Sequence, residues 1–109
     1  MRDHKIEIFV KGTPLALSYS DPEKEVKPGD RVQWSCDSHD YAIQFANAKS
    51  PFDPPVLSLS KAAKTLTDRY TVRARKGRGK DPHKYTVAVH VNDPSPILTD
   101  DPIIIVDDE

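Results

Sequence analysis

The chain has 109 residues, of which 37% are hydrophobic and 30% are charged, so residues 1–109 have the size of a single domain with one core. No run approaches the roughly 18 apolar residues of a membrane-spanning helix, and a single cysteine excludes an internal disulfide or a multi-thiolate metal site. Sixteen Lys and Arg residues against 17 Asp and Glu residues give a net charge of −1. This balance argues against a generally basic nucleic-acid binder.

The first ten residues lack the apolar h-region and the cleavage site of a signal peptide. Read as a complete chain, the protein is expected in the cytoplasm. If a signal peptide has been removed, a periplasmic or secreted location is expected instead. A lone cysteine fits either compartment.

Apolar and polar residues alternate with period two in several short runs, which is the pattern of strands with one buried face. A further run, 103–106, is continuously apolar and predicts a final strand covered on both faces. The positions expected on the buried faces are Ile6, Ile8, Val10, Val32, Trp34, Cys36, Tyr41, Ile43, Phe45, Tyr70, Val72, Ala74, Tyr85, Val87, Val89 and Val91.

Ten prolines and four glycines punctuate these runs. Pro28 and Gly29 fit the two central positions of a type II turn, and residues 76–82 predict a flexible hairpin loop. The prolines in 50–55 exclude a strand there, and 58–66 is the only stretch that suits a helical turn, with Ser60 as its cap. About seven or eight short strands predict an all-β fold, an antiparallel Greek-key β-sandwich.

Four segments resemble the cupredoxin family. Residues 26–34 (VKPGDRVQW) are similar to the family's Pro-Gly-Asp-type turn and the strand with alternating Val and Trp after it, and 41–45 (YAIQF) to the strand that follows. Residues 83–89 (HKYTVAV) are similar to the strand that carries the copper thiolate, and 103–106 to the closing strand. The resemblance implies a cupredoxin-like fold and covers most of the chain apart from 51–66.

The copper ligands of that family do not carry over to this sequence. The position of the first histidine ligand holds Tyr41, and that of the cysteine ligand holds Val89. The only methionine is Met1, and His90 is expected to point away from the site. Because a blue-copper centre needs two histidines and a cysteine, the resemblance implies a domain without this cofactor, and we expect no other cofactor.

Two groups of side chains are candidate metal sites. Cys36 and His39 lie in the polar run 36–40, but Cys36 continues a buried strand face and is surrounded by aspartates, so an inert core thiol is the favoured interpretation. The four histidines His4, His39, His83 and His90 match no common zinc spacing. A non-standard metal site around Cys36 and His39 therefore stays as an alternative.

A basic cluster lies in 73–84, opposed there only by Asp81. It predicts either a solvated hairpin tip or a patch for a polyanion or an acidic partner. The following segment, 93–109, has six acids and no base, and it reads as a solubilising tail or as a complement to the cluster. The candidate patch residues are Arg73, Arg75, Lys76, Arg78, Lys80 and Lys84.

No Ser-His-Asp order, catalytic carboxylate pair or phosphate loop is present. The sequence thus predicts a small non-enzymatic binding or interaction module. Its partner is an unidentified protein or a second copy of the chain, rather than a nucleic acid or a membrane. The alternatives are the metal-handling protein and the polyanion-binding protein described above.

Overall fold

The computed structural model describes residues 2–12, 15–46, 50–55, 58–74, 77, 79–91 and 97–108. Within these ranges the chain forms strands and no helix, so the all-β class is confirmed. The strands are β1 (Asp3–Lys11), β2 (Ala16–Tyr19), β3 (Glu23–Val26), β4 (Arg31–Cys36), β5 (Tyr41–Phe45), β6 (Ser58–Lys61), β7 (Tyr70–Thr71), β8 (Gly79–His90), β9 (Ile97–Asp100) and β10 (Ile103–Asp108).

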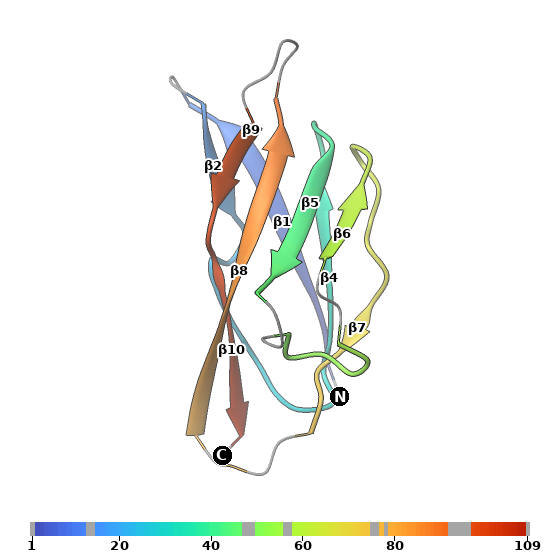
Figure 1. The fold of residues 1–109 in the computed structure, drawn as a ribbon, viewed down its shortest axis with the longest axis vertical. Helices are drawn as coiled ribbons and strands as arrows, with labels where there is room; N and C mark the ends of the chain where they lie inside the picture. Colours follow the sequence, from blue (N-terminus) through green and yellow to red (C-terminus); the bar gives the residue numbers. More distant parts are fainter. Residues whose placement is uncertain are drawn as a thin grey trace.

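These strands form two sheets that face each other (Figure 1). The first sheet has the order β2-β1-β4-β7, and the second has the order β3-β10-β8-β5-β6, with β9 also paired to β8. Both sheets are mixed, because β1 runs parallel to β4 and β10 runs parallel to β3. The prediction of a purely antiparallel sandwich is therefore wrong, since alternation marks a strand's faces and says nothing about its direction.

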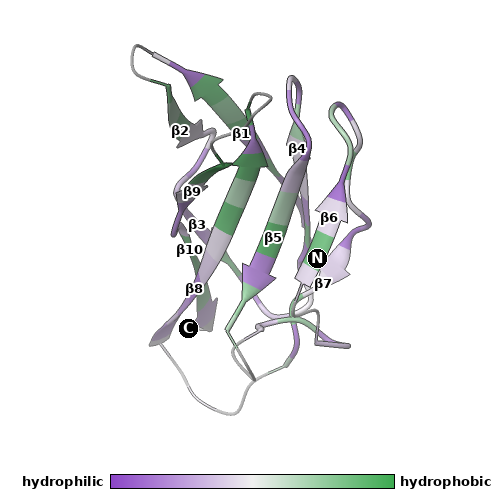
Figure 2. Ribbon diagram, turned by 45° about the horizontal axis from the view of Figure 1, so that its top comes forward, coloured by the Kyte–Doolittle hydropathy of each residue, from purple (hydrophilic) through white to green (hydrophobic). Residues whose placement is uncertain are grey.

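The core lies between the sheets and contains most of the positions expected from the alternation. Figure 2 shows hydrophobic and hydrophilic residues alternating along β5 and β8. Val10 and Tyr70 are only half-buried, and Ala74 is exposed because β7 ends at Thr71. In β10, Ile104 and Val106 are buried whereas Ile103 and Ile105 are half-buried, so this strand is not covered equally on both faces.

Trp34 is the centre of an aromatic cluster that joins the two sheets. Its indole Nε1 donates a hydrogen bond to the Tyr85 hydroxyl at 3.2 Å, which satisfies a buried polar group. Its ring centroid lies 5.5 Å from that of Tyr85 and 5.9 Å from that of Phe52, both in edge-to-face geometry. Phe52 is buried in the core and forms an isolated β-bridge with Val72. Residues 50–55 form no strand, as their prolines predict.

The turn before β4 has the predicted geometry. Asp30 N donates to Lys27 O at 3.0 Å, and Gly29 has a φ of 90°, which suits the third position of a type II turn. The Asp30 carboxylate also accepts hydrogen bonds from the backbone N–H groups of Arg2 and Lys27 and from His4 Nε2. Burial alone would raise the pKa of Asp30, but these hydrogen bonds outweigh it and lower the pKa below the ordinary value of 3.8.

Two local predictions are wrong. In place of a helical turn at 58–66, residues 58–61 form β6 and pair with β5, because cross-strand contacts override a weak local preference. The strands that flank the expected hairpin at 76–82 do not pair with each other, since β7 pairs with β4 in the first sheet whereas β8 belongs to the second; Lys76 and Arg78 lie outside the described residues. Strand β8 already begins at Gly79.

The acidic segment 93–109 contains strands rather than only a solvated tail. Strand β9 and strand β10 pair antiparallel to successive parts of β8 with the same offset, as Val87↔Asp100 and Lys84↔Ile103 show. Between them Pro102 has no N–H to donate, although its carbonyl accepts from Tyr85 N at 3.1 Å. Strands β9 and β10 thus lie one after the other along the same side of β8 in the second sheet.

Candidate functional site

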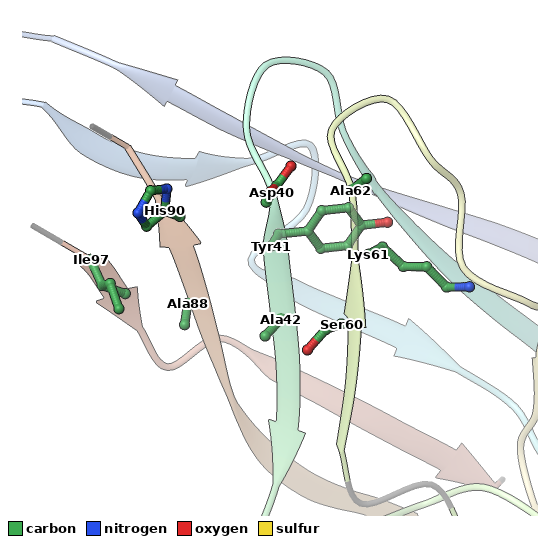
Figure 3. Close-up of a pocket in the computed structure, with 9 residues that line it drawn as sticks. All are labelled: Asp40, Tyr41, Ala42, Ser60, Lys61, Ala62, Ala88, His90 and Ile97. Carbon is green, nitrogen blue, oxygen red and sulfur yellow. The ribbon is translucent and has the colours of Figure 1, made fainter. Parts of the chain in front are cut away.

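A groove of about 400 Å³ lies on the outer face of the second sheet, over β5, β6, β8 and β9 (Figure 3). Its floor is low because Ala42 and Ala88 are direct cross-strand partners with one-carbon side chains. Ser60 stands beside Ala42 on β6. The groove is lined by Asp40, Tyr41, Ala42, Ser60, Lys61, Ala62, Ala88, His90 and Ile97.

One wall of the groove is an exposed aliphatic side chain. Ile97 begins β9, pairs with His90 on β8, and keeps 58% of its surface accessible. Its neighbour Leu98 packs against the core instead, as the alternation of a strand requires. The opposite wall is formed where the chain leaves β6 at Ala62. Apolar surface therefore lines both the floor and one side.

Polar groups stand at one end of the groove. Asp40 Oδ1 accepts a hydrogen bond from Ala63 N at 3.0 Å, which fixes the carboxylate beside the groove. His90 N donates to Asp40 O at 3.0 Å, so the two residues are neighbours across β5 and β8. No hydrogen bond or ion pair joins the side chains of these two described residues, and both are exposed. The arrangement offers one acceptor and one imidazole above an apolar floor.

Tyr41 lines the groove but directs its ring inward. Its hydroxyl lies within hydrogen-bond distance of the carbonyls of Trp34 and Thr65. Burial raises the pKa of Tyr41 to about 12, with the neighbouring Cys36 and Tyr70 adding to the shift, so the phenol is neutral at pH 7. Its cross-strand partner is Val89, which is fully buried. The two positions that the cupredoxin resemblance aligns with copper ligands thus lie side by side on neighbouring strands. A phenol and an alkyl group occupy them.

The two residues of the alternative metal site lie in different environments. Cys36 is a free thiol with 1% of its surface exposed, at the end of β4 on the core face. His39 lies in the following turn, half-buried, with Nδ1 2.8 Å from Ser38 Oγ. Among the described residues, no group of three or more His, Cys, Asp or Glu side chains is placed to share a metal ion.

The other histidines are dispersed over the molecule. His4 Nε2 lies 2.8 Å from Asp30 Oδ2, and His83 Nε2 lies 3.0 Å from Asp81 Oδ2. On β8, His83 is buried and His90 is exposed; the prediction that they point to opposite faces is confirmed.

The basic cluster is described only in part, because Arg75, Lys76 and Arg78 lie outside the described residues. Arg73 follows β7 of the first sheet, whereas Lys80 and Lys84 lie on β8 of the second. Lys80 Nζ is 2.7 Å from Glu25 Oε1 of β3. Within the described part, therefore, one of the cluster's cations already has an acidic neighbour in the chain.

Sequence reasoning did not single out the groove. Asp40, Ala42, Ala88, His90 and Ile97 form no recognisable motif along the chain. Alternation does place Ala42 and Ala88 on the outward side of their strands. The missing step is the register, which sets these two alanines opposite each other.

The described part of the chain contains no helix that is long and apolar enough to cross a membrane. No protein-family model matches the chain, and no curated protein is significantly similar to it.

Proposed function

We propose that this chain is a non-enzymatic binding module that uses the outer groove of the second sheet. The observation that carries the proposal is the groove itself, with an apolar floor at Ala42 and Ala88 and polar groups at one end. Concave, mostly apolar surface with a few polar groups is the usual setting of a binding site. The exposed Ile97 adds an anchor of the kind that interfaces bury.

The fold that we propose for this module is cupredoxin-like without a blue-copper centre. The two ligand positions of the resembled family must lie close together if they are to share one ion. Positions 41 and 89 are direct cross-strand partners, which supports the resemblance. A neutral phenol and a valine at these positions leave no thiolate or imidazole for copper.

The binding proposal is tested with small organic probes, 2-propanol and phenol, titrated into the isotope-labelled protein. Amide chemical shifts should change mainly at Ala42, Ala88, His90 and Ile97, because the probes occupy the apolar floor. Ala88→Arg should abolish these changes by filling the groove. The matched control Ala16→Arg, on an exposed position of the other sheet, should leave them intact. Changes scattered over both sheets would contradict the proposal.

The absence of a copper centre is tested by adding Cu(II) to the purified protein. We expect no intense absorption band around 600 nm, since that band arises from a copper–thiolate bond. A strong blue colour that is lost in Cys36→Ser would overturn this part of the proposal and the placement of Cys36 in the core.

A further inference from the structure

We infer that the groove is occupied by the same groove of a second copy of the chain. Two copies would pack the outer faces of their second sheets together about a two-fold axis. The axis runs along the strands, between β5 and β8. The inference rests on the proposed binding function and names the partner that the groove fits.

The strand register arranges the groove side chains in two rows across the sheet. One row crosses the sheet from the start of β9, over the end of β8 and the residue before β5, to the residue after β6. Its members, in that order, are Ile97, His90, Asp40 and Ala62. The second row contains Ala88, Ala42 and Ser60 of the groove, preceded by Thr99, which lies outside the groove lining but pairs with Ala88.

Rotation about a two-fold axis between β5 and β8 places each row opposite the same row of the second copy, in the reverse order. The imidazole of His90 then meets the Asp40 carboxylate of the other copy, and the reverse contact forms on the other side of the axis. A neutral imidazole still donates one N–H to such a carboxylate. The row is therefore complementary to itself in charge and in hydrogen bonding.

The same operation matches the sizes of the side chains. The exposed Ile97 of one copy meets the small Ala62 of the other, and Ala88 meets Ala42. The two alanine pairs let the sheets approach closely at the axis, while each isoleucine fills the open end of the opposite groove. Thr99 and Ser60 place hydroxyl groups opposite each other in the second row. When twisted sheets pack face to face, the strands of one sheet cross those of the other at about 30°. This angle disturbs the contacts nearest the axis least.

The size of this face predicts a weak dimer. Strand spacing of about 4.8 Å and a two-residue repeat of about 6.8 Å give roughly 260 Å² per copy over four strands and two rows. The resulting total of about 520 Å² is well below the roughly 1,200–2,000 Å² of stable complexes. We therefore expect a dissociation constant on the order of 0.1 mM.

The inference is tested by nuclear magnetic resonance of the full chain between about 20 µM and about 1 mM, a range that spans the dissociation constant of a weak complex. The rotational correlation time should rise with concentration toward that of a dimer. Concentration-dependent amide shifts should map to Asp40, Ala42, Ala88, His90 and Ile97. A constant correlation time, or shifts that map to the first sheet or to β3 and β10, would overturn the inference.

Two sets of variants test the geometry of the contact. Ile97→Ala should weaken the dimer at least tenfold, with little effect on folding because Ile97 is mostly exposed. The matched control is Leu15→Ala, which truncates another exposed aliphatic side chain, with 43% of its surface accessible; it should leave the dimer unchanged.

His90→Asp should weaken the dimer at least tenfold by placing carboxylates against each other. Adding Asp40→Asn should recover much of the loss, since the amide removes one charge and its oxygen still accepts from Ala63 N. No recovery in the double variant would show that these residues do not meet across the interface. If organic probes bind the groove while the chain stays monomeric, the binding function stands and the second copy is the wrong occupant.

Discussion

The two faces of strands β5 and β8 have opposite compositions. The inner face contains large side chains that are almost completely buried, namely Tyr41, Ile43, Phe45, Tyr85, Val87 and Val89. On the outer face, the residues between them include Ala42 and Ala88, which form the floor of the groove. The inner face stabilises the sandwich by removing apolar surface from water, whereas the outer face leaves space that a partner can fill.

One pair of strands therefore contributes to the core with its inner face and to the proposed binding groove with its outer face. A change on the inner face should lower the free energy of unfolding, and a change on the outer face should alter only the groove. The same contrast holds for the acids that precede two core strands. Asp30 is buried and accepts three hydrogen bonds, whereas Asp40 is exposed at the groove.

The largest effect is expected for Trp34→Ala, which removes the centre of the aromatic cluster against the inner face. Truncating a fully buried tryptophan should lower the free energy of unfolding by about 3–5 kcal/mol. Thermal or urea unfolding measures this loss. An unchanged melting temperature would show that the inner and outer faces are assigned the wrong way round.

The next largest effect is expected for Asp30→Asn, which removes a charged acceptor with three donors. The variant should lose about 2 kcal/mol at pH 7. Because the folded pKa of Asp30 is lowered, its stabilisation is present above the ordinary value of 3.8 and is lost as the pH falls through the folded pKa. Urea unfolding from neutral to acid pH should therefore show the two proteins converging below about pH 4.

Asp40→Asn is the matched control for that measurement. It changes an exposed acid that keeps its contact to Ala63 N, so its stability should stay within about 0.5 kcal/mol of the parent. A loss as large as that of Asp30→Asn would show that the groove end is as important to folding as the buried turn.

A smaller loss, about 1 kcal/mol, is expected for Tyr41→Phe. The ring still fills the inner face, but the carbonyls of Trp34 and Thr65 lose their common donor. Urea unfolding measures the loss, and Phe45→Tyr serves as a comparison in which a hydroxyl is added to the same face. A stability equal to that of the parent would mean that the hydroxyl has no role in holding segment 62–67 against β4.

The smallest effect is expected for Ala88→Val on the outer face. The added methyl groups enter the groove rather than the core, so stability should change by less than about 0.5 kcal/mol, while binding of the organic probes should weaken. A loss of more than about 1 kcal/mol would show that this position is packed and would end the contrast between the two faces.

Part of the candidate site was accessible from the sequence. Alternation alone places Tyr41 inward and Ala42 outward, and it separates His83 from His90 on one strand. It does not show that Asp40 lies beside His90, or that Ile97 begins a strand next to them, because these neighbours come from segments distant in the sequence. A short stretch such as 97–100 is too brief for periodicity to identify.

The sequence by itself determined that this is an all-β domain, where most core side chains point, and that Pro28 and Gly29 form a turn, because these properties depend on local backbone chemistry and a two-residue repeat. Tertiary structure decided the rest. It set β1 parallel to β4 and β10 parallel to β3, made 58–61 a strand, and brought Ala42, Ala88 and Ile97 to one groove. Strand direction and register depend on which distant surfaces bury each other best, and an alternating pattern is the same in every such pairing.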